Sequence, residues 1–394
     1  MIAQVHAQDS SRARPRSRAR VLVVEEGWAT TLPVVRAIRR AGHEVTVLTA
    51  NGAAKPTRHK RVDWHSAPAL DAASFVQYVD TFVARGGFDL ILPLTEAVME
   101  RMWETTCSWV TKIFPQVEAW QRRLVFDKHL LIEHLADRSI PIPKHRRVVS
   151  GLDVMATVRE FGLPLVVKGD SGSDGSRVRI VETIGELADA LAEATVLGGE
   201  WIAQEYVASP TFLVGGVFHA GEPLCLYAAE KLAQHPPRVG GATRVRSLSD
   251  PALVELGTRI VRELRWTGFA SVDLVRRADG QYLLLEVNPR PWRSLAGAAA
   301  AAVDLFTPFT ALLSGTAPIA KLDFVPGVDT WIFPKYLESA EPRGVLAWWR
   351  GVRDLFGEQG RDWRDLRFAP HLIRRIQRTR SLARIHALRR ETMR

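Results

Sequence analysis

Two acidic residues in the last third of the chain are spaced so that they predict a metal site. They lie in the segment GFASVDLVRRADGQYLLLEVNPRPW, where Asp279-Gly280 is a strong signal for a two-residue β-hairpin turn. With that turn, Asp273 and Glu286 face each other with Cβ atoms about 5 Å apart, where like charges repel unless a cation bridges them. Asn288 projects from the same face. Two carboxylates and an amide oxygen suit Mg²⁺ or Mn²⁺.

An arginine just beyond this pair extends the prediction from metal to phosphate. Arg290 stands between Pro289 and Pro291, whose rings fix the backbone and hold the guanidinium near the metal face. A planar guanidinium suits a transferring phosphoryl group, which gives Arg290 a catalytic role. Two alternatives stay open. Arg290 caps the following helix or pairs with an acidic neighbour, and Arg276 or Arg277 relieves the repulsion on an exposed hairpin face.

The segment PLVVKGDSGSDGSRVRIV predicts a phosphate-binding loop. A strand that ends at Lys168 leads into a loop containing Gly169, Gly172 and Gly175, and a second strand begins near Arg177. Glycines and serines let successive backbone N–H groups turn toward one anion, and the lysine adds a point charge. In a Walker loop the lysine instead follows the glycines and opens a helix. The alternative is a flexible hairpin with a surface lysine.

The segments before this loop predict the elements that carry it. A βαβ unit is expected over Val21–Val24, Leu32–Ala41 and Glu44–Leu48, followed by a helix near Ala72–Arg85 and a strand at Asp89–Pro93. This order indicates a doubly wound parallel sheet. The turn EEGWAT lacks the G-x-G-x-x-G spacing of a dinucleotide site, so a structural or substrate-lining domain is favoured over NAD binding.

The second half of the chain has a mixed pattern. A helix is expected over Leu124–Asp137, and residues 145–207 alternate between strands and helices. Strands follow from Phe212 to about Val287, interrupted by one helix at Pro251–Leu264, and a further helix covers roughly Trp292–Val303. The expected class is therefore α/β, with a mixed unit after the parallel sheet.

Together these pieces resemble the ATP-grasp superfamily over roughly residues 120–310. The resemblance implies an α+β ATP-grasp fold preceded by a Rossmann-like α/β domain. It also implies ATP as the nucleotide and Mg²⁺ (or Mn²⁺) held by Asp273, Glu286 and Asn288. The family's two lysines are matched by Lys128 in FDKHLL and by Lys168. Its adenine-binding hinge is matched in WIAQEYV by Gln204, Glu205, Tyr206 and Val207.

One departure and one further likeness refine the resemblance. The family often has an acidic residue after the hinge for the ribose hydroxyls, where this chain has Thr211. The stretch AEKLAQHPPRVGGATRVRS is similar to stand-alone carboxylate–amine ligases, in which Lys231, Arg238 and Arg244 would neutralise phosphate or substrate carboxylate. A neutral surface loop is the alternative for this stretch.

The resemblance implies a ligase that phosphorylates a small-molecule carboxylate to an acyl phosphate and joins it to an amine. Three other functions remain open: carboxylation through carboxyphosphate, nucleotide binding without turnover, and nucleic-acid binding. The expected division is a disordered basic tail (1–20), an N-terminal α/β domain (21–120), an ATP-grasp domain (121–320) and a C-terminal basic helical extension (321–394).

The net charge of +10 is concentrated at the two ends of the chain. Residues 1–20 carry +4 and residues 371–394 carry +7, so the remaining residues sum to −1. A near-neutral body argues against nucleic acid as a partner. Two cysteines cannot form a disulfide framework or a zinc site by themselves. The start of the chain lacks the pattern of a secretory signal, and the expected location is the cytoplasm.

The basic C-terminal segment predicts an amphipathic helix. Leu372, Ile373 and Ile376 recur at helical spacing, with arginines between them. Such a helix is expected to bring the enzyme to the periphery of an anionic membrane or to an acidic partner. The alternatives are packing on the body of the enzyme, a homodimer contact, and a solvated tail.

Overall fold

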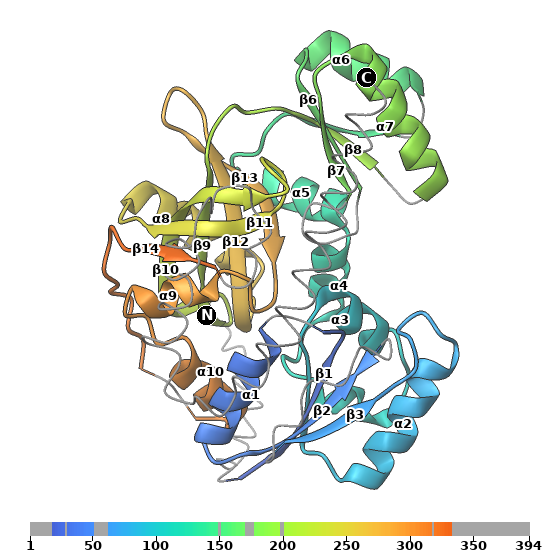
Figure 1. Ribbon diagram of the computed structural model, residues 1–394, viewed down its shortest axis with the longest axis vertical. Helices are drawn as coiled ribbons and strands as arrows, with labels where there is room; N and C mark the ends of the chain where they lie inside the picture. Colours follow the sequence, from blue (N-terminus) through green and yellow to red (C-terminus); the bar gives the residue numbers. More distant parts are fainter. Residues whose placement is uncertain are drawn as a thin grey trace, which may run out of the picture.

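Three β-sheets form the framework of the protein (Figure 1). The computed structural model describes residues 18–27, 30–50, 62–148, 151–169, 177–197, 201–316 and 319–332. Gly172, Gly175, most of the predicted N-terminal tail and the predicted C-terminal helix lie outside these residues. Within the described ranges, no helix is both long enough and apolar enough to cross a membrane.

The first sheet is parallel, as the βαβ pattern predicts, with strand order β3-β2-β1-β4. Its strands are β1 (Arg20–Glu25), β2 (Glu44–Thr49), β3 (Asp63–Ser66) and β4 (Leu90–Pro93). Its helices are α1 (Thr31–Arg40), α2 (Ser74–Gly86) and α3 (Glu96–Trp103). The strand order reverses between β1 and β4, and ligands of open α/β sheets bind beside the carboxyl ends of strands at such a point.

A pair of helices links this sheet to the rest of the chain, after the 3-10 turn η2 (Ser108–Lys112). The helix predicted over Leu124–Asp137 is wrong, because the structure has two helices, α4 (Ala119–Phe126) and α5 (Lys128–Ala136). Asp127 separates them with an extended backbone, and its carboxylate accepts the Leu130 amide at 2.8 Å as the N-cap of α5. The break places Lys128 at the first position of α5.

The second sheet is small and has its own core. Its elements are β5 (His145–Val148), α6 (Gly151–Phe161), β6 (Leu165–Gly169), β7 (Val178–Val181), α7 (Ile184–Leu197) and β8 (Trp201–Glu205). The strands pair antiparallel in the order β5-β8-β6-β7. Leu165, Val167, Leu187 and Ala203 are among the residues buried in its core. In Figure 1 this unit extends from the rest of the molecule beside the third sheet.

The third sheet is antiparallel, with strand order β13-β12-β9-β10-β11-β14. Its strands are β9 (Thr211–His219), β10 (Glu222–His235), β11 (Gly241–Ser247), β12 (Gly268–Arg276), β13 (Tyr282–Asn288) and β14 (Asp329–Trp331). Its helices are α8 (Pro251–Glu263), α9 (Leu295–Ala300) and α10 (Phe306–Leu313). The helix predicted from Trp292 thus begins three residues later, after the turn that follows Pro291.

The first and third sheets pack against each other through α10. Phe114 and Phe309 have ring centroids 5.9 Å apart, and α10 also contacts α1. His43, the residue before β2, hydrogen-bonds Ser314 at 2.9 Å. The buried apolar residues of the two sheets form continuous clusters, whereas the small sheet keeps a separate one. The small sheet is therefore the unit with the least apolar attachment to the rest.

The hairpin of β12 and β13 pairs Asp273 with Glu286, as predicted, but through a different turn. The Arg277 amide donates to the Gln281 carbonyl at 2.9 Å, which leaves a three-residue loop, and Gly280 takes the left-handed φ of 92° that this loop requires. The predicted two-residue turn is wrong. A β-bulge between the Asp273 and Leu274 pairs shifts the register back by one residue.

Candidate active site

A cavity of about 770 Å³ lies between the small sheet and the third sheet. Most of the predicted site residues line it, although they come from separate parts of the chain. They are Lys128, Lys168, Gly169, Gln204, Glu205, Tyr206, Val207, Lys231, Arg238, Asp273 and Glu286. Valine, isoleucine and leucine side chains from both sheets add an apolar lining, namely Val166, Val178, Ile180, Val275 and Leu285. The cavity thus combines an apolar part with clustered charges.

The paired carboxylates each hold an ammonium group from another element. Lys231 of β10 reaches across β9 and places Nζ 2.5 Å from Oδ2 of Asp273. Lys128, at the start of α5, places Nζ 3.2 Å from Oε1 of Glu286. Both lysine side chains are largely buried. The site therefore attracts positive charge at both carboxylates.

The pKa values of the two carboxyl groups are shifted in opposite directions from their ordinary values. Burial raises the pKa of Asp273, and the ammonium of Lys231 offsets only part of this effect. Burial also opposes ionisation of Glu286. The ammonium of Lys128, helped by Arg290 and Lys168, outweighs burial and holds the pKa of Glu286 below its usual value. A cation placed between the two groups would stabilise both charges.

Lys168 at the end of β6 joins the small sheet to the third sheet. Its ammonium donates to Oε1 of Gln204 at 3.0 Å and to the carbonyl of Leu285 at 3.2 Å. Leu285 is the residue that the bulge leaves without a partner in the strand ladder. Lys168 is 7% exposed, and burial together with the charge of Lys128 lowers its pKa to about 8. A cation kept under these conditions is suited to receiving an anion.

The predicted hinge begins with the last two residues of β8, Gln204 and Glu205, whose side chains have different environments. Gln204 is buried, and its Nε2 has no hydrogen-bond partner among the residues that the structure describes. Glu205 instead binds Arg277 at 2.7 Å and the Lys144 amide at 3.1 Å, so its carboxylate fastens the hinge to its neighbours. Thr211, at the position expected for a ribose contact, lies 3.5 Å from the Gln234 amide oxygen and lines the cavity.

Two predicted arginines do not join the carboxylate cluster. Arg238 lines the cavity at another edge, where it pairs with Glu182 at 2.9 Å and lies over the ring of Tyr206. Its side chain is about half exposed. Arg244 pairs with Asp329 and stacks on the ring of Trp331. The structure thus places Arg244 in a salt bridge near the edge of the sheet. Lys231 instead pairs with Asp273 of the carboxylate cluster.

Arg290 lies beside the metal-type oxygens, and its side chain is 7% exposed. Its Nη2 donates to Oδ1 of Asn288 at 3.1 Å. Its Nε lies 3.1 Å from Oε2 of Glu96, the first residue of α3 in the parallel-sheet domain. The pairing with an acidic neighbour that the sequence left open is thus present. Its partner comes from a distant part of the chain, the start of α3.

Two residues of this region were missed in the sequence. Glu96 follows β4 at the carboxyl edge of the first sheet, and a Thr-Glu pair at a strand end was the available signal. Arg177 lines the cavity at the far end of the Gly-rich segment and packs on the ring of Trp201. A basic residue that closes a Gly-rich loop could have been included as a phosphate ligand.

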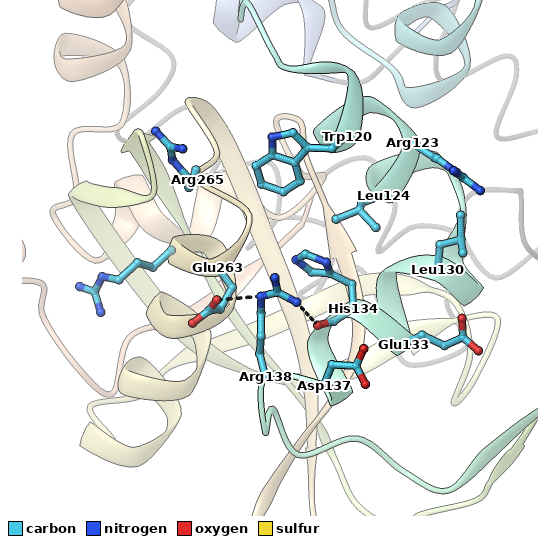
Figure 2. A pocket seen from close by; sticks show the side chains of 11 residues that line it. Trp120, Arg123, Leu124, Leu130, Glu133, His134, Asp137, Arg138, Glu263 and Arg265 are labelled. Atoms are coloured by element: carbon cyan, nitrogen blue, oxygen red, sulfur yellow. Dashed lines mark hydrogen bonds and ion pairs between the residues drawn. The ribbon is translucent and has the colours of Figure 1, made fainter. Parts of the chain in front are cut away.

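A second cavity, of about 820 Å³, is the larger of the two but contains none of the predicted site residues (Figure 2). It lies between α4, α5 and the end of α8, with the rings of Trp120 and His134 stacked at its centre. Arg138 fills part of it, bound to Glu263 at 3.3 Å and to the His134 carbonyl at 2.9 Å. The smaller cavity is therefore the candidate site, because it gathers the groups that can do chemistry.

Comparison with known proteins finds a likeness over the part of the chain that contains these residues. Residues 125–294 match the ATP-grasp domain family model. The chain is 31% identical over 189 residues to a D-alanine–D-alanine ligase of Desulforudis audaxviator (strain MP104C), covering 43% of this chain and 59% of that protein. It is 24% identical over 160 residues to the corresponding ligase of Pseudomonas fluorescens (strain Pf0-1), covering 39% and 49%. The chain thus spans about half the length of the curated relatives it matches.

Solved structures extend the likeness to most of the chain. A biotin carboxylase from Campylobacter jejuni superposes with a TM-score of 0.66 at 15% identity, over 79% of this chain and 74% of that one. An L-amino acid ligase from Bacillus licheniformis gives 0.62 at 17% identity, over 76% and 74%. An N5-carboxyaminoimidazole synthetase from Staphylococcus aureus, complexed with ADP, gives 0.64 at 15% identity, over 82% and 83%. These structures share the fold of the chain, and residues 125–294 carry its likeness to the ATP-grasp domain family.

Proposed function

We propose that this protein is an ATP-dependent ligase that converts a small-molecule carboxylate into an acyl phosphate and joins it to an amine. One observation carries the proposal. Asp273 and Glu286 face each other in the wall of a cavity that also contains two lysines from other elements. The curated ligases that the chain resembles, and the L-amino acid ligase among the structures, support the same reaction class.

The nucleotide would occupy the cavity between the two sheets. The apolar lining suits an adenine ring. The backbone N–H and C=O groups of the hinge, from Gln204 to Val207, would bind the polar edge of that ring. Gln204 Nε2 is a buried donor that an acceptor on the nucleotide would satisfy. Lys168 and Lys128 would neutralise phosphate charge, with Gly169 letting the backbone approach closely. Thr211 leaves the ribose with a hydroxyl contact in place of a carboxylate.

The residues present fit a divalent metal. Asp273, Glu286 and Asn288 offer hard oxygen atoms, and the two carboxylates already hold cationic groups in the form of lysine ammoniums. Mg²⁺ held by these three residues would neutralise charge on the β- and γ-phosphates. Mn²⁺ satisfies the same donor set. Asn288 is further fixed by the hydrogen bond from Arg290.

The proposed reaction has two steps that use the same charged cluster. In the first, a substrate carboxylate oxygen attacks the γ-phosphorus, the bond to the β–γ bridging oxygen breaks, and ADP leaves. Arg290 would stabilise the transferring phosphoryl group, with Lys231 and Arg238 as further cations of the site. In the second, an amine attacks the acyl carbon and phosphate leaves. Positioning and electrostatics supply most of the rate enhancement.

The deciding experiment is a screen for ADP release with Mg²⁺-ATP and single amino acids or small carboxylates, with and without an added amine. A ligase releases ADP in proportion to amide formed, and both substrates are required. ADP release that depends on bicarbonate in place of a second amine would instead indicate carboxylation, the chemistry named in two of the structural relatives. ATP binding without ADP release under all conditions would indicate a nucleotide-binding module.

The C-terminal segment gives a separate prediction about location. We propose that the enzyme is cytoplasmic and that residues 371–394 bring it to an anionic surface, gaining roughly 1 kcal/mol for each basic residue near a membrane. A chain ending at Pro370 should co-sediment less with anionic vesicles at low salt than the full chain, and should keep its ADP release. Equal sedimentation would contradict the membrane contact. Loss of turnover would show that the segment belongs to the folded core, and a change in molecular mass would indicate a homodimer contact.

A further inference from the structure

The ion pair between Glu96 and Arg290 joins α3, beside the first sheet, to the segment that follows β13. Arg290 is nearly buried, and its Nε lies 3.1 Å from Oε2 of Glu96, whose side chain is 26% exposed. Glu96 follows β4, and the strand order of the first sheet reverses between β4 and β1. Ligands of such sheets bind beside the strand ends at that point. A carboxylate of the first domain thus reaches the phosphate-side arginine of the ATP-grasp domain.

A second acid at the same sheet edge has a different environment. Glu25 ends β1 and is 2% exposed. Its carboxylate accepts the Thr49 hydroxyl at 2.5 Å, the Gly27 amide at 2.5 Å and the Thr31 hydroxyl at 3.1 Å. These contacts fix the loop after β1 within its own domain. Of these two acids, Glu96 is the one that pairs with Arg290.

The remaining carboxylates of the cluster are neutralised by lysines. Asp273 pairs with Lys231 and Glu286 with Lys128, and both are assigned here to metal and phosphate. Glu96 pairs with Arg290, a cation that the first reaction step needs on the phosphoryl group. When Arg290 turns to the acyl phosphate, Glu96 is left with a negative charge in a partly desolvated position. That charge requires a new cation.

From this exchange we infer that Glu96 binds the amine substrate as its ammonium ion and accepts its proton. This role rests on the proposed ligase function. The ammonium replaces the guanidinium of Arg290, so the charge at Glu96 stays balanced. Transfer of one proton to the Glu96 carboxylate frees the nitrogen lone pair, which forms the C–N bond. The bond from the acyl carbon to the phosphate oxygen breaks, and phosphate leaves with the electron pair and carries off the second nitrogen proton. The geometry thus assigns a cationic amine to the position beside Glu96 that the guanidinium of Arg290 now occupies.

Hydroxylamine provides a test because it is a neutral nucleophile near pH 7.5 and needs no ammonium site. The wild-type full chain is first given Mg²⁺-ATP, hydroxylamine and single carboxylates, and the hydroxamate formed identifies the activated acid. In E96Q, hydroxamate formation should stay within about threefold of wild type. Amide formation with an amine that is protonated at this pH should fall roughly 100-fold or more, the usual size of a lost general base.

The pH profile separates this role from a structural one. Amide formation by E96Q should rise with pH, because the fraction of free amine rises, and the KM for the amine should increase. E96D should recover part of the activity. E104Q on the same helix is the matched control, because Glu104 is 63% exposed and lies 4.0 Å from Arg101. It should behave as wild type in both assays.

The outcomes are distinguishable. Equal loss of hydroxamate and amide in E96Q would overturn the inference. It would indicate that Glu96 acts only structurally, by holding Arg290 through their ion pair. Full retention of both would overturn it as well. Absence of hydroxamate and ADP with every carboxylate in the wild type would refute the ligase function itself, and the amine role with it.

Discussion

Replacing Glu286 by glutamine is expected to lower kcat by about a thousandfold while the protein stays folded, in line with losing a preorganised charge at a reacting phosphate. The amide keeps the size of the side chain and one oxygen. It removes the charge that pairs with Lys128 at 3.2 Å and faces Asp273 across the hairpin. The expected defect is therefore in chemistry, because the negative charge that would hold Mg²⁺ is halved.

Asn288→Ala should have an effect of the same kind, because it removes the third oxygen proposed to hold Mg²⁺ and the acceptor of an Arg290 hydrogen bond. The measurement is ADP release at saturating ATP and Mg²⁺, together with circular dichroism and the melting temperature. Asp279→Asn is the matched control. It changes an acid in the loop of the same hairpin, where the Asp279 side chain accepts the Gln281 amide, and it should leave turnover unchanged. Turnover near wild type in Glu286→Gln would refute the metal assignment.

The paired carboxylates could be predicted from sequence, although the reasoning contained an error. The Asp-Gly signal marked a hairpin but did not separate a two-residue turn from a three-residue loop, because Gly280 with positive φ fits both. The bulge then restored the predicted pairing. Nothing local in the sequence marks the bulge. The bulge leaves Leu285 without a partner in the strand ladder, and its carbonyl accepts a hydrogen bond from Lys168. This contact forms only when the small sheet and the third sheet come together.

Contacts between distant elements account for most of what sequence did not reveal. The bridge from Lys231 to Asp273 joins strands separated by a third strand, and the bridge from Arg290 to Glu96 joins the segment after β13 to α3 beside the first sheet. Such pairs depend on tertiary packing and have no periodicity to detect. The helix break at Asp127 is different. An aspartate at an N-cap followed by an apolar run is a local signal, and it could have been recognised.

Lys168, the buried lysine at the end of β6, is proposed to bind phosphate. Lys168→Ala should weaken ATP binding by about 1.5–3 kcal/mol, the range for a hydrogen bond to a charged group, or roughly 10- to 150-fold in Kd. Isothermal titration calorimetry with Mg²⁺-ATP measures this directly. Lys144, the residue before β5, is not among the residues that line the cavity and offers a control, since Lys144→Ala should bind ATP as wild type does. Unchanged affinity in Lys168→Ala would refute the phosphate role.

The unfolding free energy should depend on pH in the way expected of a buried lysine with a lowered pKa. The folded pKa of Lys168 is about 8, below its ordinary value of 10.5, so the folded state binds this proton less tightly than the unfolded chain does. The penalty is fully present below pH 8 and disappears as pH rises toward 10.5. At neutral pH it amounts to about 3 kcal/mol at most. Lys168→Met, which keeps the volume, should therefore keep or raise the unfolding free energy while it loses ATP affinity.

The same lysine should couple ATP binding to proton uptake. Phosphate stabilises the charged form, so between about pH 8 and 9 ATP should bind together with up to one proton, and affinity should fall as pH rises. Titrations in buffers of different ionisation enthalpy report the number of protons taken up. Lys168→Met should lose this uptake. If the variant takes up protons as the wild type does, or if its unfolding free energy falls in parallel with its ATP affinity, the charge of Lys168 is not what receives the phosphate.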